Sequence, residues 1–242
     1  MDRALFAAAS GMAAQQRSLE TIADNLANAG VVGFKGSAQT FAELVAPGEG
    51  GLGTVALGPR VVFAQGKLAR SAGPFDLAID GPGFFAVLDA QGRRRYTRDG
   101  SFSRAADGTL RNAQDLRLEG VRIPSDALAV TVGAGGSVRA TFPGATRTIG
   151  RIRLSEFAAP ERLRSLGGAL FEATPEAGKR REIVAGANEG PQLRFGMLEE
   201  SNVTVVDAMM QILAAQRAYE ANAKGVQAAD EMLRIANNLQ RG

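Results

Sequence analysis

The stretch "NLANAGVVGFKG", residues 25 to 36, ends a long helix-like pattern at the start of the chain. Two asparagines three positions apart, Asn25 and Asn28, close the pattern, and small residues followed by a Phe-Lys pair come next. Asn28 or Ala29 ahead of Gly30 suits a helix end, because Gly tolerates the left-handed conformation that closes many helices. We interpret the stretch as a joint at which a terminal helix passes into a different structure.

Apolar residues before the joint recur every seven positions, and a second row is offset from them by three. Such an a/d pattern is typical of a helix that packs against another helix. Asn25 can bond to that neighbouring helix and fix its register, while Phe34 is expected to anchor the departing chain against the helix pair. The first row is Leu5, Met12, Leu19 and Leu26, and the second is Ala8, Ile22 and Ala29.

The C-terminal stretch carries the same seven-residue pattern. Its first row is Val205, Ile212, Tyr219, Val226 and Leu233, and its second is Ala208, Ala215, Ala229 and Ala236. Small seam residues permit close approach but bury little area each, so each helix needs a partner. We expect the two terminal helices to pair as an antiparallel coiled coil and their seams to form an assembly interface with other copies of the chain.

Between the two helical patterns the sequence reads as short strands. From residue 75 to residue 157, apolar alternations are separated by Asp-Gly and Gly-Gly turns, which are hairpin signals. Residues 46 to 59 hold many Gly and two Pro and indicate a flexible or extended connection. The predicted fold is α+β, with a terminal helical domain at 1–36 and 198–242, a linker or extended segment at 37–74 and a central antiparallel β domain at 75–197.

The composition excludes most enzyme chemistry. The chain has no Cys and no His, so it has no thiolate or imidazole metal site and no Ser-His-Asp device. The Gly-rich turn at 80–83 lacks the spacing of a nucleotide-binding loop, and the nearby aspartates mostly flank Gly turns, where Asp commonly caps its own backbone. We therefore expect no catalytic residue, no cofactor, no metal ligand and no enzymatic activity.

The charge pattern does not indicate nucleic acid or a membrane as partner. The formal net charge is +3, and the densest basic runs, at 93–95 and 179–181, are three residues long and are expected at solvated turns. Nowhere do about 20 apolar residues follow one another, as membrane insertion would require. The N-terminus lacks the apolar core of a cleaved secretory signal, so we expect any export to use another route.

Three motifs, in order along nearly the whole chain, resemble one family. They are "MDRALFAAASGMAAQQRSLETIADNLANAGVVGFKGS" at 1–37, "GPFDLAIDGPGFFAVLD" with "YTRDGSF" at 73–102, and "GMLEESNVTVVDAMMQILAAQRAYEANAKGVQAADEMLRIANNL" at 196–239. Together they are similar to the bacterial flagellar rod, hook and hook-associated axial proteins. Asp24 stands where the family motif has Asn. Within the family, distal-rod subunits are most similar and proximal-rod subunits are the nearest alternative, because the connection after "FAELV" is shorter than in typical distal-rod subunits.

The resemblance implies a structural subunit of the flagellar basal body, in the rod that spans the periplasm. Such subunits form a helical tube, with the terminal helices around an export channel and the β domain outside them, and the tube carries torque from motor to hook. The implied partners are other copies, other rod subunits and the hook protein, the surrounding P- and L-ring proteins, and the flagellar type III export apparatus. The motif residues that the resemblance singles out are Gly33, Phe34, Lys35, Asn202, Gln216, Arg217 and Asn222.

A second class of function fits the same pattern of helices and strands. A periplasmic binding module with a helical stalk and a β ligand-binding domain would share the stalk and the strands. It would not require matched heptads at both ends, and it would work as a monomer or a small bundle. Size measurement against concentration, followed by electron microscopy, separates the two classes.

Overall fold

The computed structural model describes residues 2–46, 49–186 and 190–239. Long helices lie toward the two ends of the chain and antiparallel strands lie between them in sequence, so the predicted α+β class is confirmed. The chain divides into two compact units. The helical unit comprises 1–29, 36–62 and 203–242, and the β unit comprises 30–35 and 63–202.

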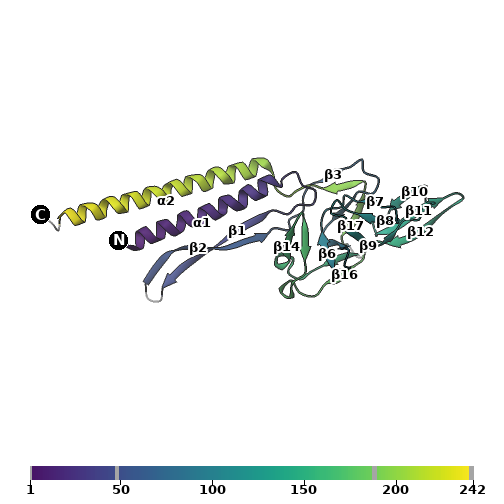
Figure 1. Cartoon of the computed structure of the whole chain (residues 1–242), viewed down its shortest axis with the longest axis horizontal. Coiled ribbons are helices and arrows are strands. Elements are labelled where there is room, and N and C mark those ends of the chain that lie inside the picture. Colours follow the sequence, from purple (N-terminus) through teal and green to yellow (C-terminus); the bar gives the residue numbers. More distant parts are fainter. Residues whose placement is uncertain (1, 47–48, 187–189, 240–242) are drawn as a thin grey trace. The chain divides into compact units, whose positions relative to one another are not determined.

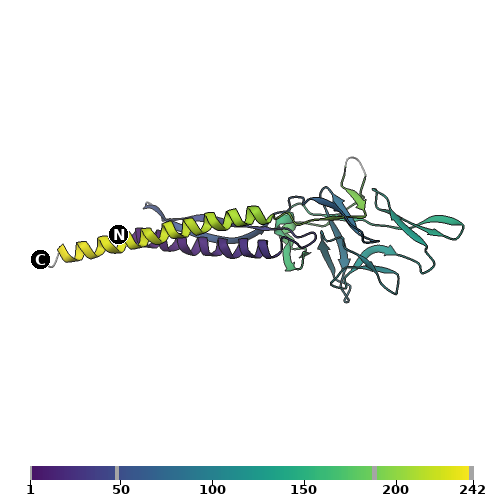
Figure 2. The same ribbon diagram turned by 90° about the horizontal axis from the view of Figure 1, so that it is seen from above.

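The helices of the helical unit are α1 (Asp2–Ala27) and α2 (Val205–Leu239). They lie side by side and run in opposite directions (Figures 1 and 2). Ile22, near the end of α1, packs with Ala215, whereas Gly11 lies against Asn222, further along α2. A Cβ atom on Gly11 would lie 2.9 Å from Nδ2 of Asn222, so the small residues of the seam are what permit this approach.

The first turn of α2 is capped by its own sequence. The backbone nitrogen of Asp207 donates to Oγ1 of Thr204 at 3.1 Å, and the Thr204 hydroxyl donates to the Asp207 carboxylate at 2.5 Å. A hydroxyl that accepts from a free helix N–H, beside an acidic residue in the first turn, stabilises a helix start. The point at which α2 begins is therefore set by Thr204.

A β-hairpin, β1 (Ser37–Ala46) and β2 (Glu49–Val61), occupies the segment that the sequence assigns to a linker. The sequence predicts a flexible or extended connection over 46–59; in the described residues of this range the chain is extended and its glycines lie in a paired ribbon with bulges. Gly53 adopts a φ of 123° next to α1, and a Cβ atom on it would lie 2.2 Å from Oγ of Ser10. Thr54 N donates to the same Oγ at 3.1 Å. The hairpin thus packs on α1 as part of the helical unit.

The β unit consists of short strands and two 3₁₀ turns. The strands are β3 (Leu68–Arg70), β4 (Leu77–Asp80), β5 (Phe84–Leu88), β6 (Arg94–Thr97), β7 (Ser103–Arg104), β8 (Thr109–Arg111), β9 (Arg117–Arg122), β10 (Ala129–Val132), β11 (Ser137–Phe142), β12 (Ala145–Arg151), β13 (Leu154–Glu156), β14 (Arg164–Gly167), β15 (Leu170–Glu172), β16 (Arg181–Ile183), β17 (Gln192–Phe195) and β18 (Met197–Glu199). The 3₁₀ turns are η1 (Pro160–Arg162) and η2 (Pro175–Ala177).

Every described strand pair is antiparallel, as the hairpin signals predict. The largest sheet has the order β14-β15-β6-β5-β9-β8-β7, and β13 joins it between β5 and β16. Smaller sheets are β10-β11-β12, β17-β4 and β18-β3. One buried apolar cluster gathers side chains from these sheets. Its largest fully buried members are Leu77, Ile79, Phe85, Val87, Leu110, Leu118, Ile123, Val138, Ile152, Leu154 and Leu193.

The sequence predicts a solvated turn for the basic run at 93–95, but the structure differs. Two of its three arginines lie in β6 and form ion pairs. Arg94 contacts Glu119 at 2.7 Å, and Arg95 contacts Glu172 at 2.8 Å. Arg180, from the second basic run, also approaches Glu119, at 3.6 Å. These arginines are therefore paired with acidic side chains along the sheet.

Candidate assembly surface and buried charge cluster

The joint at the end of α1 begins with a side-chain cap. Nδ2 of Asn28 donates to the backbone oxygen of Asp24 at 2.8 Å, and Asn28 N donates to the same oxygen at 3.2 Å. The side-chain bond thus adds a second donor to the carbonyl that accepts the last i→i−4 main-chain bond of the helix. The helix therefore ends where the sequence predicts. The glycine with the left-handed backbone is Gly33, with a φ of 66°, and not Gly30 as expected.

The bond of Asn25 to a neighbouring helix, which the sequence predicts, is not what the structure has: Asn25 bonds to the hairpin. Its Nδ2 donates to the backbone oxygen of Ser37 at 2.7 Å, and Ser37 N donates to its Oδ1 at 2.8 Å. The side chain is 8% exposed. Asn25 therefore fixes the register between α1 and the first residue of β1, within the helical unit.

Gly33 packs tightly against the main chain of the β unit. A Cβ atom at this position would lie 2.4 Å from the nitrogen of Asp99 and 2.5 Å from the carbonyl carbon of Arg98. Gly33 N donates to the backbone oxygen of Glu199 at 2.7 Å. Both the positive φ and the absence of a side chain are required here, so this position admits only glycine without rearrangement.

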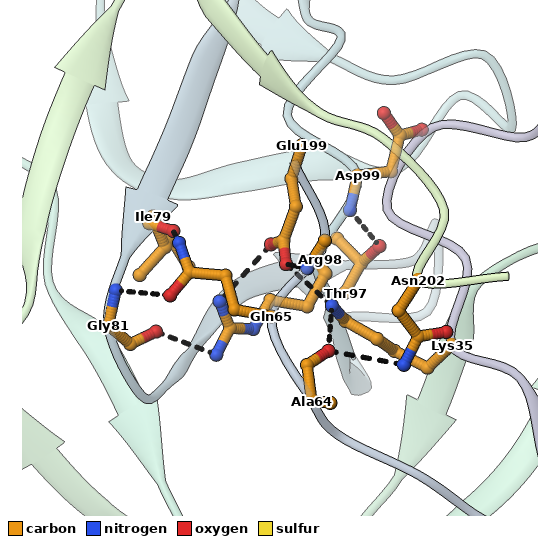
Figure 3. Close-up of polar contacts among 11 residues, drawn as sticks. Lys35, Ala64, Gln65, Ile79, Gly81, Thr97, Arg98, Asp99, Glu199 and Asn202 are labelled. Atoms are coloured by element: carbon orange, nitrogen blue, oxygen red, sulfur yellow. Dashed lines mark hydrogen bonds and ion pairs between the residues drawn. The ribbon is translucent and has the colours of Figure 1, made fainter. Parts of the chain in front are cut away.

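Two residues further on, Lys35 enters a buried charge cluster (Figure 3). Its Nζ lies 2.5 Å from Oε1 of Glu199, and it also donates to the backbone oxygen of Ala64 at 2.8 Å. The other carboxylate oxygen of Glu199 accepts from Nη1 of Arg98 at 3.2 Å. Neither the Lys35 nor the Glu199 side chain is exposed, and the Arg98 side chain is 4% exposed. One carboxylate therefore serves two buried cations.

Main-chain groups complete the coordination of these charges. Gly66 N donates to Oε1 of Glu199 at 2.8 Å, and Nη2 of Arg98 donates to the backbone oxygen of Gly81 at 2.9 Å. Gln65 bridges the same region, because its Nε2 donates to the oxygen of Ile79 and its Oε1 accepts from Gly81 N (Figure 3). Nε of Arg98 is buried and has no hydrogen-bond partner among the described atoms.

The burial of the cluster opposes its own ionisation. Removal from water lowers the pKa of the Lys35 ammonium, while the hydrogen bond and the negative charge of Glu199 act in the opposite direction. Burial likewise lowers the pKa of the Arg98 guanidinium, and the charge and hydrogen bond of Glu199 raise it. Because the two cations are stabilised by the same carboxylate, the ionised cluster depends on Glu199.

The cluster brings together residues that the sequence places in three separate motifs. The separations along the chain are 164 residues between Lys35 and Glu199 and 101 residues between Arg98 and Glu199. Asn202 joins them, since its Nδ2 donates to the oxygen of Ala64 at 3.1 Å and its nitrogen donates to the oxygen of Phe34 at 3.4 Å. The sequence motifs include Lys35 and Asn202 as candidate residues. They did not reveal that Glu199 pairs with both Lys35 and Arg98.

The seam and motif positions predicted for the helices differ in how far their side chains are buried. Those packed together between the helices are Leu19, Ile22, Leu26, Ala208, Ile212 and Ala215. Leu5, Met12, Asn222 and Val226 are half-buried, and Gln216 and Arg217 are exposed. Val205 and Tyr219 are 49% and 41% exposed. The side chain of Leu233 lies outside the described residues.

A second apolar surface on α2 faces away from α1. Val206, Met209, Met210 and Leu213 follow one another at i, i+3, i+4 and i+7, and each is between 55% and 67% exposed. At 100° per residue these positions lie opposite Ala208 and Ala215, which contact α1. We call these four residues the outer stripe.

The described residues hold no cluster of three or more metal-ligating side chains. No helix in the described part of the chain is long and apolar enough to cross a membrane.

Family models and full-length relatives match this chain in the regions that build the cluster. Residues 5–35 match "Flagella basal body rod protein", residues 78–140 match "Flagellar hook protein FlgE/F/G D1 domain", and residues 195–239 match "Flagellar basal body rod FlgEFG protein C-terminal". The flagellar basal-body rod protein FlgG of Borreliella burgdorferi is 36% identical over 264 residues, with all of both chains covered. The chain belongs to the flagellar basal-body rod protein family. Lys35, Arg98 and Glu199 fall one in each of the three matched regions.

Other rod proteins are similar over nearly their full length. FlgG of Agrobacterium fabrum is 34% identical over 260 residues, covering 97% of this chain and 98% of the relative. FlgF of Salmonella typhimurium is 32% identical over 252 residues, covering 99% and 98%. The chain is thus a structural subunit of the flagellar basal body and not an enzyme, and it assembles with other flagellar axial components. The alternative of a helical-stalk binding module is not supported.

Proposed function

We propose that this rod subunit assembles with copies of itself through its helical unit into a helical tube. In the tube, α1 and α2 pair as a coiled coil in the layer around the export channel, and the assembled rod carries torque from motor to hook. The observation that carries the proposal is the outer stripe of α2, which a single chain leaves in water on the side opposite α1.

A helix that is apolar on opposite faces is normally buried on both. In α2 one face is covered by α1, while Val206, Met209, Met210 and Leu213 have no cover within the described chain. A contact between this stripe and a different surface of the next copy is heterologous, and heterologous contacts that do not close into a ring extend into a helical filament. Val205 and Tyr219, which are also exposed, extend the proposed interface along α2.

The position of the subunit in the rod and its further partners are part of the proposal. The motifs at 96–102 and 196–239 resemble distal-rod subunits, so we place this subunit in the distal segment, in contact with the hook protein at one end and other rod subunits at the other. The P- and L-ring proteins would surround it, and the flagellar type III apparatus would export it.

The test compares two exposed leucines, Leu213 on the outer stripe and Leu128, which is 71% exposed in the β unit. Sedimentation over a concentration series, followed by electron microscopy of the pelleted material, would measure assembly of the wild type, Leu213→Gln and Leu128→Gln. We expect wild type and Leu128→Gln to form filaments and Leu213→Gln to remain monomeric. Filament formation by Leu213→Gln at the wild-type concentration would contradict the proposed role of the outer stripe.

A further inference from the structure

Glu199 accepts hydrogen bonds from two of the segments by which the chain passes between its two units. The chain leaves or enters the β unit at 29–30, 35–36, 62–63 and 202–203. Within the β unit, Glu199 accepts from Lys35 on the first of these segments and from Gly66 on the second. Its backbone oxygen accepts from Gly33 N. On the third segment, Asn202 bonds to Ala64 and Phe34.

The charges at this point do not balance without Glu199. Among the described residues, the ion pairs of Lys35 and of Arg98 are both made to Glu199. If the carboxylate is absent, two buried cations lie near one another with only the oxygens of Ala64 and Gly81 to accept from them. Removing one partner from a buried pair is strongly destabilising, because the remaining charge is left without compensation. Removing one of the two cations leaves the other still paired.

The order of the chain adds a second consequence. Gly33, Lys35 and Gly66 all come well before Glu199 in the chain. The separations from Glu199 are 166, 164 and 133 residues, respectively. Until β18 is in place, the amide groups of Gly33 and Gly66 lack their acceptor and Lys35 lacks its counter-ion. Docking these segments early would bury unsatisfied donors, which is unfavourable.

We propose that Glu199 is a positioning residue that holds the segments 30–35 and 63–66 in place within the β unit, so that these segments become ordered only once the C-terminal segment of the unit has folded in. The two segments of the β unit that adjoin α1 and the hairpin in sequence are then ordered by a residue that lies shortly before α2. This inference concerns a single chain and does not depend on the proposed assembly.

The chain supplies a matched control for the experiment. Glu119 also lies between two arginines, Arg94 at 2.7 Å and Arg180 at 3.6 Å, but its side chain is 28% exposed. Glu199→Gln and Glu119→Gln remove the same charge from the same arrangement, one buried and one in contact with water. At position 199 the amide NH₂ of Gln must face Lys35, Arg98 or the Gly66 amide, and each of these groups is a donor.

The measurement is native-state hydrogen exchange of the full chain, followed by mass spectrometry of peptic fragments. In Glu199→Gln we expect exchange in 30–36 and 63–67 to accelerate at least ~10-fold, with a much smaller change in the core strands at 84–123. In Glu119→Gln we expect changes of less than about 3-fold in every fragment. Unchanged exchange at 30–36, or an equal acceleration in all fragments, would overturn the proposal.

Lys35→Met tests the imbalance of charge directly, because it leaves Arg98 and Glu199 as a one-to-one pair. We expect its acceleration at 30–36 to be smaller than that of Glu199→Gln, and an equal or larger effect would overturn the proposed asymmetry. If Glu199→Gln does not fold, the double variant Lys35→Met/Glu199→Gln decides the question, because it leaves a single unpaired cation. A folded double variant with fast exchange at 30–36 supports the positioning role. A folded one with unchanged exchange there, or an unfolded one, which would show that Glu199 is needed for the whole unit, would overturn it.

Discussion

Asn25 and Ser37 exchange two hydrogen bonds, from Nδ2 to the Ser37 oxygen at 2.7 Å and from Ser37 N to Oδ1 at 2.8 Å. The planar side-chain amide offers one donor and one acceptor to a strand, as a peptide group of a neighbouring strand does. The first residue of β1 is thus paired to α1 by a side chain. The bonded pair sets where the hairpin begins along the helix.

We predict that Asn25→Ala lowers the free energy of unfolding of the helical unit by roughly 1–3 kcal/mol, because it leaves the partly buried N–H and C=O of Ser37 without their side-chain partner. Asn28→Ala is the matched control, since Asn28 bonds only within its own helix end among the bonds that the structure shows. Urea unfolding followed by circular dichroism at a helix wavelength measures both losses. Equal losses for the two variants would show that the bonds to Ser37 contribute nothing specific.

Gly33 and Gly92 separate the effect of backbone conformation from that of close packing. Both have positive φ, 66° and 76°, but a Cβ atom would clash at Gly33 and would meet nothing within 4 Å at Gly92. Gly92→Ala should destabilise by about 1–2 kcal/mol, the ordinary preference against the left-handed region. Gly33→Ala should cost several times more, because Asp99 and Arg98 must also move. Thermal unfolding of the two variants measures the difference, and similar melting temperatures would refute the close-packing argument.

Ala215 tests the seam between the helices. It is 6% exposed and packs with Ile22, whereas its neighbour Ala214 is exposed. Ala215→Leu overpacks this contact, for which we expect a loss of about 1–3 kcal/mol in the stability of the helix pair, and Ala214→Leu should leave it unchanged in the free subunit. We also expect Ala215→Leu to impair assembly more than it disturbs the β unit. Sedimentation of the variant at the wild-type level would count against this prediction.

Asp99 should make the stability of the β unit depend on pH. Burial raises the pKa of its carboxyl above the ordinary value, and the nearby charge of Asp76 raises it further, while hydrogen bonds from Ser101 lower it. A carboxyl whose pKa is higher in the folded state favours folding most below its unfolded pKa, and this contribution is lost as the pH rises through the folded value. The sign is therefore opposite to that of an acid in a salt bridge.

Asp99→Asn keeps an oxygen that can accept from Ser101 N, at 2.9 Å in the wild type, but cannot ionise. We expect the variant to gain stability relative to the wild type as the pH rises from about 4 towards 7, since only the wild type must then bury a charge. Urea unfolding at a series of pH values measures the difference between the two proteins. A wild type that gains stability over the variant with rising pH would contradict the prediction.

The parts of the fold that follow from local chemistry were predictable. The heptad rows locate both helices, and the contacts of Ile22 with Ala208 and Ala215 fall on predicted seam positions. The Asp-Gly turns locate the strands of the β unit, because turn chemistry acts over a few residues. Asn28 closes α1 for the same reason, through a bond four residues back.

The parts that depend on distant residues were not predictable in the same way. Glycines in a ribbon and glycines in a linker look alike, so the hairpin became visible only through its pairing and through the approach of Gly53 to Ser10. Asn25 has a partner in Ser37 that no helical periodicity indicates. Similarly, a charged residue such as Glu199 has no local sign of being buried, since its partners lie 101 and 164 residues away.

Two of the four outer-stripe residues, Met209 and Met210, are methionines, and Met232, further along α2, is also exposed. An unbranched thioether adjusts its shape to its neighbour more readily than a branched side chain does. A surface of this kind can pack against neighbours that are similar but not identical, such as the first subunit of a different axial protein at the end of a segment. The same sulfurs are open to oxidation while the subunit is free, and the polar sulfoxides that result would weaken the stripe. For the assembly proposed above, these methionines would have to stay reduced until the subunits meet.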